Sequence, residues 1–206
     1  MSGIAPGPDG RLRCRWCVAT ADYVRYHDTE WGFPVDNDQR LFEKLCLEGF
    51  QAGLSWRTIL AKRENFRAAF EGFDFRAVAR FSKRDVSRLL RDASIVRHRA
   101  KIEAVINNAR RAEELVAEAG SLAAFIWSFE PASTDRARLQ QAVSTVPAAI
   151  ALSEALKRRG WAFIGPTTVY SFRQATRLVN GHAKGCVTRA EVDHARTAFG
   201  RPRQLV

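Results

Sequence analysis

The 206-residue sequence has no apolar segment approaching the roughly 18 residues that a membrane-spanning helix requires. Residues 1–11 lack the apolar core of a secretion signal. There is also no alternating apolar and polar pattern of useful length, and no internal repeat. These absences exclude an integral membrane protein, favour an all-α fold, and lead us to expect a cytoplasmic location.

Cysteine and histidine are scarce, at four residues each. Because disulfides are uncommon in the cytoplasm, metal binding is the better interpretation of the cysteines. His182 precedes Cys186 by four residues, and Cys14 precedes His27 by thirteen. Structural zinc takes four tetrahedral nitrogen and sulfur ligands, often as two pairs. A zinc bound by these two pairs would tie the ends of the chain together.

The spacing does not decide which N-terminal thiol would bind the metal, because Cys14 and Cys17 form a C-x-x-C sequence and either could be the ligand. Cys46 lies in an apolar run and is expected in the core. His98 and His194 have no thiol close in sequence and are weaker candidates. The alternative is that all these residues are scattered and bind no metal.

Acidic residues are outnumbered by basic ones, 22 to 33, which gives a net charge of +11. Such a charge favours a polyanionic partner, because cations that neutralise phosphates release condensed counterions. The charge is dispersed, so we expect a basic face on a folded domain rather than a basic arm. The alternative is a composition that simply uses arginine wherever a solvated cation serves.

The composition, 46% hydrophobic and 27% charged, is that of one globular domain. We expect a flexible Gly/Pro-rich tail at residues 1–11, a single helical domain in one or two lobes at 12–187, and a tail at 188–206. Apolar spacing and capping residues predict the helices. The first is expected from Asp36 or Asp38 to about Gly49 or Gly53. The others are expected from Ser55 through Phe70, from Ser82 through Leu90, at 102–116, from Ser121, at 152–159, and at 167–179, with residues 129–150 irregular or weakly helical.

Glu48 falls at the boundary between the apolar and polar rows of the first long predicted helix. It could be solvated and paired with Lys44, one turn earlier. Three large rings lie outside the predicted helix cores, at Trp16, Tyr26 and Trp56. Such rings are often core residues, but together with a carboxylate they also suit a flat cation, such as a flipped alkylated nucleobase.

Several segments together resemble the DNA-3-methyladenine glycosylase I family, over about residues 13–186. They are Arg13-Cys14-x-Trp16, Tyr26-His27-Asp28-x-Glu30-Trp31-Gly32, Leu47-Glu48-Gly49-x-Gln51-Ala52-Gly53-Leu54-Ser55-Trp56, Ile95-Val96-Arg97-His98-Arg99-x-Lys101-Ile102, Phe125-Ile126-Trp127-Ser128-Phe129, Leu156-Lys157-Arg158-Arg159-Gly160, Tyr170-Ser171-Phe172 and Val179-Asn180-x-His182-x-x-x-Cys186.

The resemblance implies an all-α fold of the helix-hairpin-helix DNA glycosylase type, with a structural zinc joining the N- and C-terminal segments. The zinc ligands that it implies are Cys14, His27, His182 and Cys186. The base-binding residues that it implies are Trp16, Tyr23, Tyr26, Glu48 and Trp56.

The resemblance also assigns DNA contacts. Gly53 and Leu54 match a turn that probes the base stack, and Arg97, Arg99 and Lys101 belong to a hairpin near residues 93–101 that binds the DNA backbone. The sequence departs from the family pattern at two positions: Ser94 replaces a hairpin glycine, and Gly181 replaces an aspartate that would orient the neighbouring histidine.

The implied activity is that of a monofunctional glycosylase, expected as a monomer on double-stranded DNA containing alkylated bases. It would flip 3-methyladenine and hydrolyse its N-glycosidic bond, which starts base excision repair. Glu48 is the residue expected at the reaction centre, where it reads the base, and these motifs offer no lysine nucleophile and no general base for the water. Two alternatives are a non-catalytic zinc-stabilised DNA-binding protein and a lesion-binding homologue without turnover.

Overall fold

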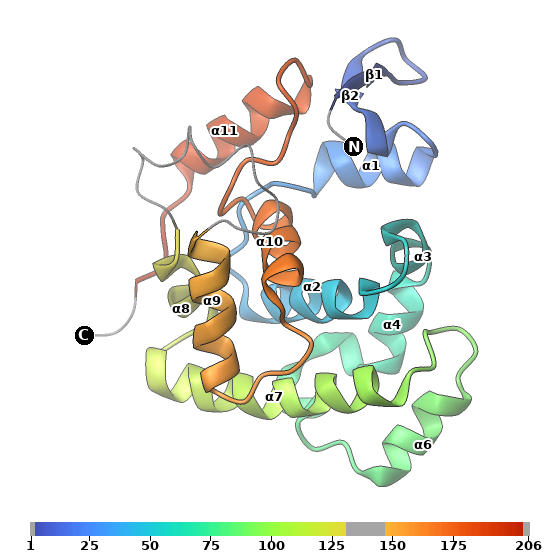
Figure 1. Ribbon diagram of the computed structural model, residues 1–206, viewed down its shortest axis with the longest axis vertical. Coiled ribbons are helices and arrows are strands. Elements are labelled where there is room, and N and C mark those ends of the chain that lie inside the picture. Colours follow the sequence, from blue (N-terminus) through green and yellow to red (C-terminus); the bar gives the residue numbers. More distant parts are fainter. Residues whose placement is uncertain (1–2, 131–146, 204–206) are drawn as a thin grey trace.

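A computed structural model describes residues 3–130 and 147–203 as a mostly helical molecule built around helix α2, which spans Asp38–Gln51 (Figure 1). The helices before and after α2 are α1 (Ala21–Thr29), α3 (Trp56–Ala61), α4 (Arg63–Ala69), α5 (Phe75–Val78), α6 (Lys83–Arg91), α7 (Arg99–Ala119), α8 (Leu122–Ser128), α9 (Pro147–Arg158), α10 (Pro166–Ala175) and α11 (Thr188–Ala198). Strands β1 (Ile4–Pro6) and β2 (Leu12–Cys14) and the 3-10 turns η1 (Arg15–Cys17) and η2 (Glu71–Phe73) complete the elements.

Helix α2 is buried along residues 41–50 because other helices cover it on several sides. It packs against α3, α7, α8 and α10, and Leu41, Leu45 and Phe50 are each no more than 1% exposed. The full enclosure differs from the boundary position that the sequence pattern suggested for Glu48. A helical wheel shows one chain alone and cannot show a second layer of helices on the polar side.

Most of the predicted helices are confirmed, and their caps explain where they begin. Ser82 and Asp85 form the reciprocal capping box at the start of α6. Ser55 and Ser121 cap α3 and α8 through their side-chain oxygens. The cap of α2 is Asn37, rather than either neighbouring aspartate.

Three helix predictions need correction. The helix expected from Ser55 through Phe70 breaks at Lys62, whose backbone leaves the helical region, so α3 and α4 are separate. Helix α10 starts earlier than expected, with Pro166 in its first turn and Gly165 at the cap. Of the segment 129–150, residues 131–146 lie outside the described residues, and α9 already begins at Pro147.

The expected tails are also partly ordered. Strands β1 and β2 pair antiparallel, with Ile4 opposite Cys14, across a tight turn in which Gly10 has a φ of 77°. Three-residue strands are too short to show alternation in a sequence. Beyond residue 187, α11 buries only Thr188 and Val192, so its apolar face is too narrow to reveal a helix. The β1–β2 sheet and α11 lie at the same end of the molecule (Figure 1).

Within residues 3–130 and 147–203, every helix is too short or too polar to span a lipid bilayer.

Candidate active site

A cavity of about 330 Å³ opens between α1, α2, α3 and α10. This volume lies in the range of small-molecule binding sites. All five side chains that the resemblance assigns to base binding line the cavity, which is bounded by Trp16, Tyr23, Tyr26, Trp31, Glu48, Gln51, Trp56, Ser171 and Gln174. The structure therefore brings together the predicted base-binding residues from three separate segments of the chain.

The aromatic side chains of the cavity brace one another at steep angles. The Trp16 ring lies 5.5 Å from Tyr23 at an interplanar angle of 82°, and 5.1 Å from Trp31 at 77°. The Tyr26 ring lies 5.5 Å from that of Trp56 at a shallower angle of 41°. The edge-to-face pairs around Trp16 fix ring orientation, so the cavity has walls that hold their shape before a ligand enters.

Among the described residues, Glu48 is the one carboxylate in the lining of this cavity, and it is 6% exposed. In the described part of the chain no hydrogen bond reaches its oxygens, and Lys44 bonds instead to Glu30, with 2.9 Å between Nζ and Oε1. Burial raises the pKa of Glu48 to about 8, and the positive charge of Lys44 opposes this only in part. The pairing of Glu48 with Lys44 that the sequence allowed does not form.

Near Tyr26, the charge of Lys44 on α2 is neutralised by an ion-pair network with Glu30 and Arg63. Glu30 accepts hydrogen bonds from Lys44 and from Arg63, with 2.7 Å between Arg63 Nη1 and Glu30 Oε2. The Lys44 ammonium and the Arg63 guanidinium lie 5.7 and 5.8 Å from the centre of the Tyr26 ring. Their attraction to the ring helps to fix the position of the tyrosine.

The sequence missed four residues of the cavity: Trp31, Gln51, Ser171 and Gln174. Trp31 and Gln51 belong to motifs on which the family resemblance rests, but the sequence analysis did not assign them to the cavity. Ser171 and Gln174 lie one turn apart on α10, and their place in the cavity depends on the packing of α10 against α2.

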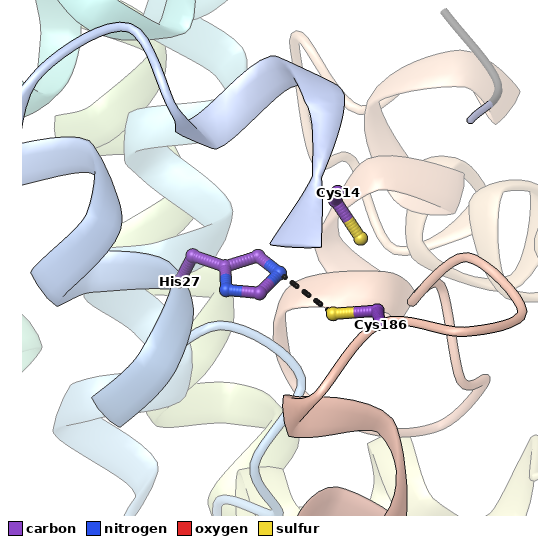
Figure 2. A group of neighbouring side chains, drawn as sticks. All are labelled: Cys14, His27 and Cys186. Carbon is purple, nitrogen blue, oxygen red and sulfur yellow. Dashed lines mark hydrogen bonds between the residues drawn. The ribbon is translucent and has the colours of Figure 1, made fainter. Parts of the chain in front are cut away.

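Where strand β2, helix α1 and the loop before α11 come together, Cys14, His27 and Cys186 form a buried cluster (Figure 2). Their potential ligand atoms all lie within 4.8 Å of one another, and Cys186 Sγ is 3.5 Å from His27 Nε2. Cys14, rather than Cys17, belongs to this group, although Cys17 also lies within hydrogen-bonding reach of His27. Two thiols and an imidazole are donors that zinc prefers.

His182 lies beside this cluster, with its ring centre 4.8 Å from that of His27. Its Nε2 is buried and lacks a hydrogen-bond partner among the described residues, whereas Nδ1 lies 3.2 Å from Asn180 Oδ1. The orienting group that Gly181 cannot supply is thus replaced by the preceding asparagine. The His27 ring is oriented in turn by Asp28, whose Oδ1 is 2.8 Å from Nδ1.

The buried Nε2 of His182, which has no hydrogen-bond partner among the described residues, indicates that a metal ion would fit this site. A buried polar atom without a partner is costly, and coordination would relieve that cost. Carboxylate and amide partners behind metal-binding histidines are typical of zinc sites. The four residues therefore could hold a zinc ion, although the His182 side chain lies outside the tightest three-residue group.

The turn after α2 and the hairpin between α6 and α7 face the solvent. Leu54 is 42% exposed, and a side chain added at Gly53, whose φ is 79°, would meet no atom within 4 Å. Arg97 and Arg99 are exposed at the start of α7. Ser94 needs no left-handed backbone, because Asp92 Oδ1 accepts hydrogen bonds from its amide and hydroxyl.

The prediction that Lys101 contacts DNA is wrong for its ammonium group. Lys101 is 7% exposed, and its Nζ donates hydrogen bonds to the carbonyls of Phe50 (2.8 Å) and Ala52 (2.5 Å). Burial lowers its pKa. A cation at the C-terminal carbonyls of α2 also favours the helix dipole. Lys101 therefore ties the start of α7 to the turn that carries Leu54.

Residues 16–190 match the family model described as methyladenine glycosylase. The chain belongs to this family. It is 48% identical over 177 residues to DNA-3-methyladenine glycosylase 1 of Escherichia coli, covering 84% of this chain and 95% of the relative. It is 42% identical to a DNA-3-methyladenine glycosylase of Haemophilus influenzae, covering 84% and 96%.

Solved structures of methyladenine glycosylases share the fold. A crystal structure of a 3-methyladenine DNA glycosylase I superposes with a TM-score of 0.78 at 47% identity, covering 85% of this chain and 98% of the other. The Staphylococcus aureus enzyme, described in terms of 3-methyladenine recognition, gives a TM-score of 0.77 at 34% identity, covering 86% and 96%.

Replacing Glu48 by glutamine should stabilise this methyladenine glycosylase increasingly as the pH rises. Between pH 4.5 and 8 the folded chain keeps a proton on Glu48 that the unfolded chain has lost, so burial of Glu48 costs stability as pH increases. The cost grows by about 1.4 kcal/mol per pH unit within this window. Melting temperatures of wild type and Glu48→Gln should therefore diverge from pH 5 to pH 8.

The matched control is Glu43→Gln on the same helix. Glu43 is equally buried but paired with Arg40 and Arg67, so this change should lower the melting temperature at neutral pH. Parallel melting curves for wild type and Glu48→Gln over the whole range would show that the Glu48 pKa is not raised.

Lys101→Met should lower the free energy of unfolding by about 2–3 kcal/mol, because two carbonyls of α2 lose a charged donor. A Lys101→Met protein of wild-type stability would contradict the buried role.

Arg97→Ala and Arg99→Ala should leave the free energy of unfolding nearly unchanged, because both side chains are exposed. Each of these variants should instead reduce the slope of log binding constant against log salt concentration for duplex DNA by about 1.

Proposed function

We propose that this chain is a monofunctional DNA glycosylase that flips 3-methyladenine out of alkylated duplex DNA and hydrolyses its N-glycosidic bond. The observation that carries the proposal is the buried Glu48 carboxylate, which has no hydrogen-bond partner among the described residues and faces a cavity walled by aromatic rings. Membership of the family and the names of its relatives support the same substrate.

Methylation at N3 gives the adenine of the nucleotide a positive charge. The rings of Trp16, Tyr26 and Trp56 would attract this charge, with about 0.5–2 kcal/mol for each well-placed ring. Glu48 would accept a hydrogen bond from the exocyclic amine of the base. Binding a cation favours the ionised carboxylate, so Glu48 gives up its proton as the base enters. A neutral adenine would offer less compensation for the buried charge.

The charged base is a good leaving group and needs little acid catalysis. Water attacks the anomeric carbon of the sugar, the bond from that carbon to the base nitrogen breaks with its electron pair going to the base, and a proton is released to solvent. No lysine side chain lines the cavity in the part of the chain that the structure describes, and Lys44, on the same helix as Glu48, is engaged by Glu30. A Schiff base with the sugar, and thus strand cleavage, is not expected.

DNA would approach over the exposed turn and hairpin. Leu54 is suited to enter the space vacated by the flipped base, as apolar wedges do in other DNA-bending proteins. Arg97 and Arg99 would bind phosphates of the backbone. Lys101 would support both regions from inside the protein rather than contact the DNA.

We also propose that Cys14, His27, His182 and Cys186 bind one structural zinc ion. The buried cluster and the orphaned Nε2 of His182 support it. When bound, the ion would join strand β2, helix α1 and the loop before α11 through coordination bonds. The Trp16 ring lies 5.5 Å from the His27 ring and lines the base pocket, so fixing His27 would also restrict the movement of this wall of the pocket.

Release of free base from methylated duplex DNA tests the activity. Wild type should release 3-methyladenine without nicking the strand, and Glu48→Ala should lose most of this release. Since Glu48 must ionise, kcat/KM of wild type should rise with pH up to about 8, and this rise should vanish in Glu48→Gln. Binding of the lesion without release by wild type would favour the homologue without turnover.

Metal analysis of the purified protein tests the zinc proposal. We expect about one zinc per chain in wild type and in the control Cys46→Ala, a buried cysteine outside the cluster. Cys14→Ser and Cys186→Ser should lose the metal and melt on the order of 10 °C lower. Zinc loss in Cys17→Ser with retention in Cys14→Ser would instead assign the N-terminal ligand to the other thiol.

A further inference from the structure

The connection between α9 and α10 crosses over α7 and is held rigidly by side chains (Figure 1). Asn108 of α7 bonds both backbone groups of Ala162, with 2.9 Å to the carbonyl and 2.8 Å to the amide. The Ser153 hydroxyl of α9 donates to the carbonyl of Ile164 at 2.7 Å. These bonds fix the backbone on both sides of one residue, Phe163.

Phe163 points outward from this fixed loop. Its neighbours Trp161 and Ile164 are 4% and 2% exposed, whereas Phe163 is 40% exposed. Its backbone φ is 55°, in the left-handed region that a residue with a Cβ adopts only at a cost. Folding gains little from an exposed ring on a strained backbone. Strain of this kind is typical of residues that serve a function.

Two neighbours place Phe163 between the elements expected to contact DNA. Its ring centre lies 6.3 Å from that of His98, which caps α7 beside the exposed Arg97 and Arg99. Its carbonyl oxygen lies 3.3 Å from where a Cβ on Gly49 would stand, in the last turn of α2. The turn that carries Leu54 follows directly.

Phe163 also lines a small crevice together with the buried Lys101. Lys101 holds the carbonyl of Ala52, two residues before Leu54. Lys101 thus holds the backbone next to the exposed Leu54 and lines the same crevice as the exposed Phe163.

We propose that Phe163 is a second DNA-contacting residue, whose ring packs against a base that is unstacked when the duplex opens at the lesion. This inference rests on the proposed glycosylase function. Aromatic side chains offer stacking surfaces to any base, and apolar side chains placed between base steps stabilise opened and bent duplexes. The neighbouring arginines supply the charge that attracts the phosphates of the same duplex. The partner of this surface is therefore duplex DNA rather than another protein.

The test compares Phe163→Ala, Phe163→Gly and Phe163→Trp with wild type, using a duplex that contains a tetrahydrofuran abasic analogue. The alanine and glycine variants should bind this duplex about tenfold more weakly, a typical effect of losing one stacked ring. The tryptophan variant should bind within about twofold of wild type, since its ring can also stack. Excision of 3-methyladenine from duplex DNA should follow the same order.

Two further measurements separate a DNA contact from a role in folding. Phe163→Gly should keep or raise the melting temperature, because glycine removes the strain of the left-handed backbone. Affinity for free 3-methyladenine should be unchanged in all three variants, because Phe163 lies outside the base cavity. Leu12→Ala is the matched control, an equally exposed apolar side chain on β2, and should change neither binding nor excision.

Wild-type affinity of Phe163→Ala for the abasic duplex would overturn the inference. A lowered melting temperature of Phe163→Gly, together with weaker binding of free base, would also overturn it by showing a structural role. Absence of base release by wild type would count against the proposed function alone. The binding comparison on the abasic duplex would still decide the role of Phe163.

Discussion

The enclosure of helix α2 is the constraint on which the site depends. A charge on a buried helix must be neutralised by partners or be reserved for a ligand, because an isolated buried ion is very costly. Glu43 is paired with two arginines and Lys44 with Glu30. Glu48, one turn further, has no such partner among the described residues and faces the cavity. In the proposed function, the same burial that raises its pKa would make Glu48 selective for a ligand that brings its own positive charge.

The second constraint is the contact between an N-terminal and a C-terminal segment of the chain. Strand β2, helix α1 and the loop before α11 converge on Cys14, His27 and Cys186, and the rings of Trp16 and Trp31 pack directly against the histidines of this region. One wall of the cavity therefore depends on contacts between residues more than 150 positions apart in the chain. The other walls come from the core helices α2 and α10, which pack against each other independently of the termini.

The surface expected to meet DNA is supported from within. Lys101 bonds to the end of α2, and Asn108, two turns further along α7, bonds to the loop that presents Phe163. Exposed side chains that open a duplex must resist being pushed back, and buried polar bonds to their backbone provide that resistance. Helix α7 thus holds the Leu54 turn, the hairpin and the Phe163 loop in fixed relation.

The sequence by itself determined the helical class, most helix starts and the family, and it indicated five of the residues that line the cavity, because these depend on local capping, on periodicity and on motifs of contiguous residues. The sequence did not predict strand β1 or helix α11 near the two chain ends, because these elements have too few buried residues to produce an apolar pattern. Only the tertiary structure decided that Lys101 points inward, that Asn180 orients His182, and that Ser171 and Gln174 join the cavity. In each case the result depends on a contact with another segment of the chain or on the direction of a side chain. The spacing of residues along the sequence determines neither of these.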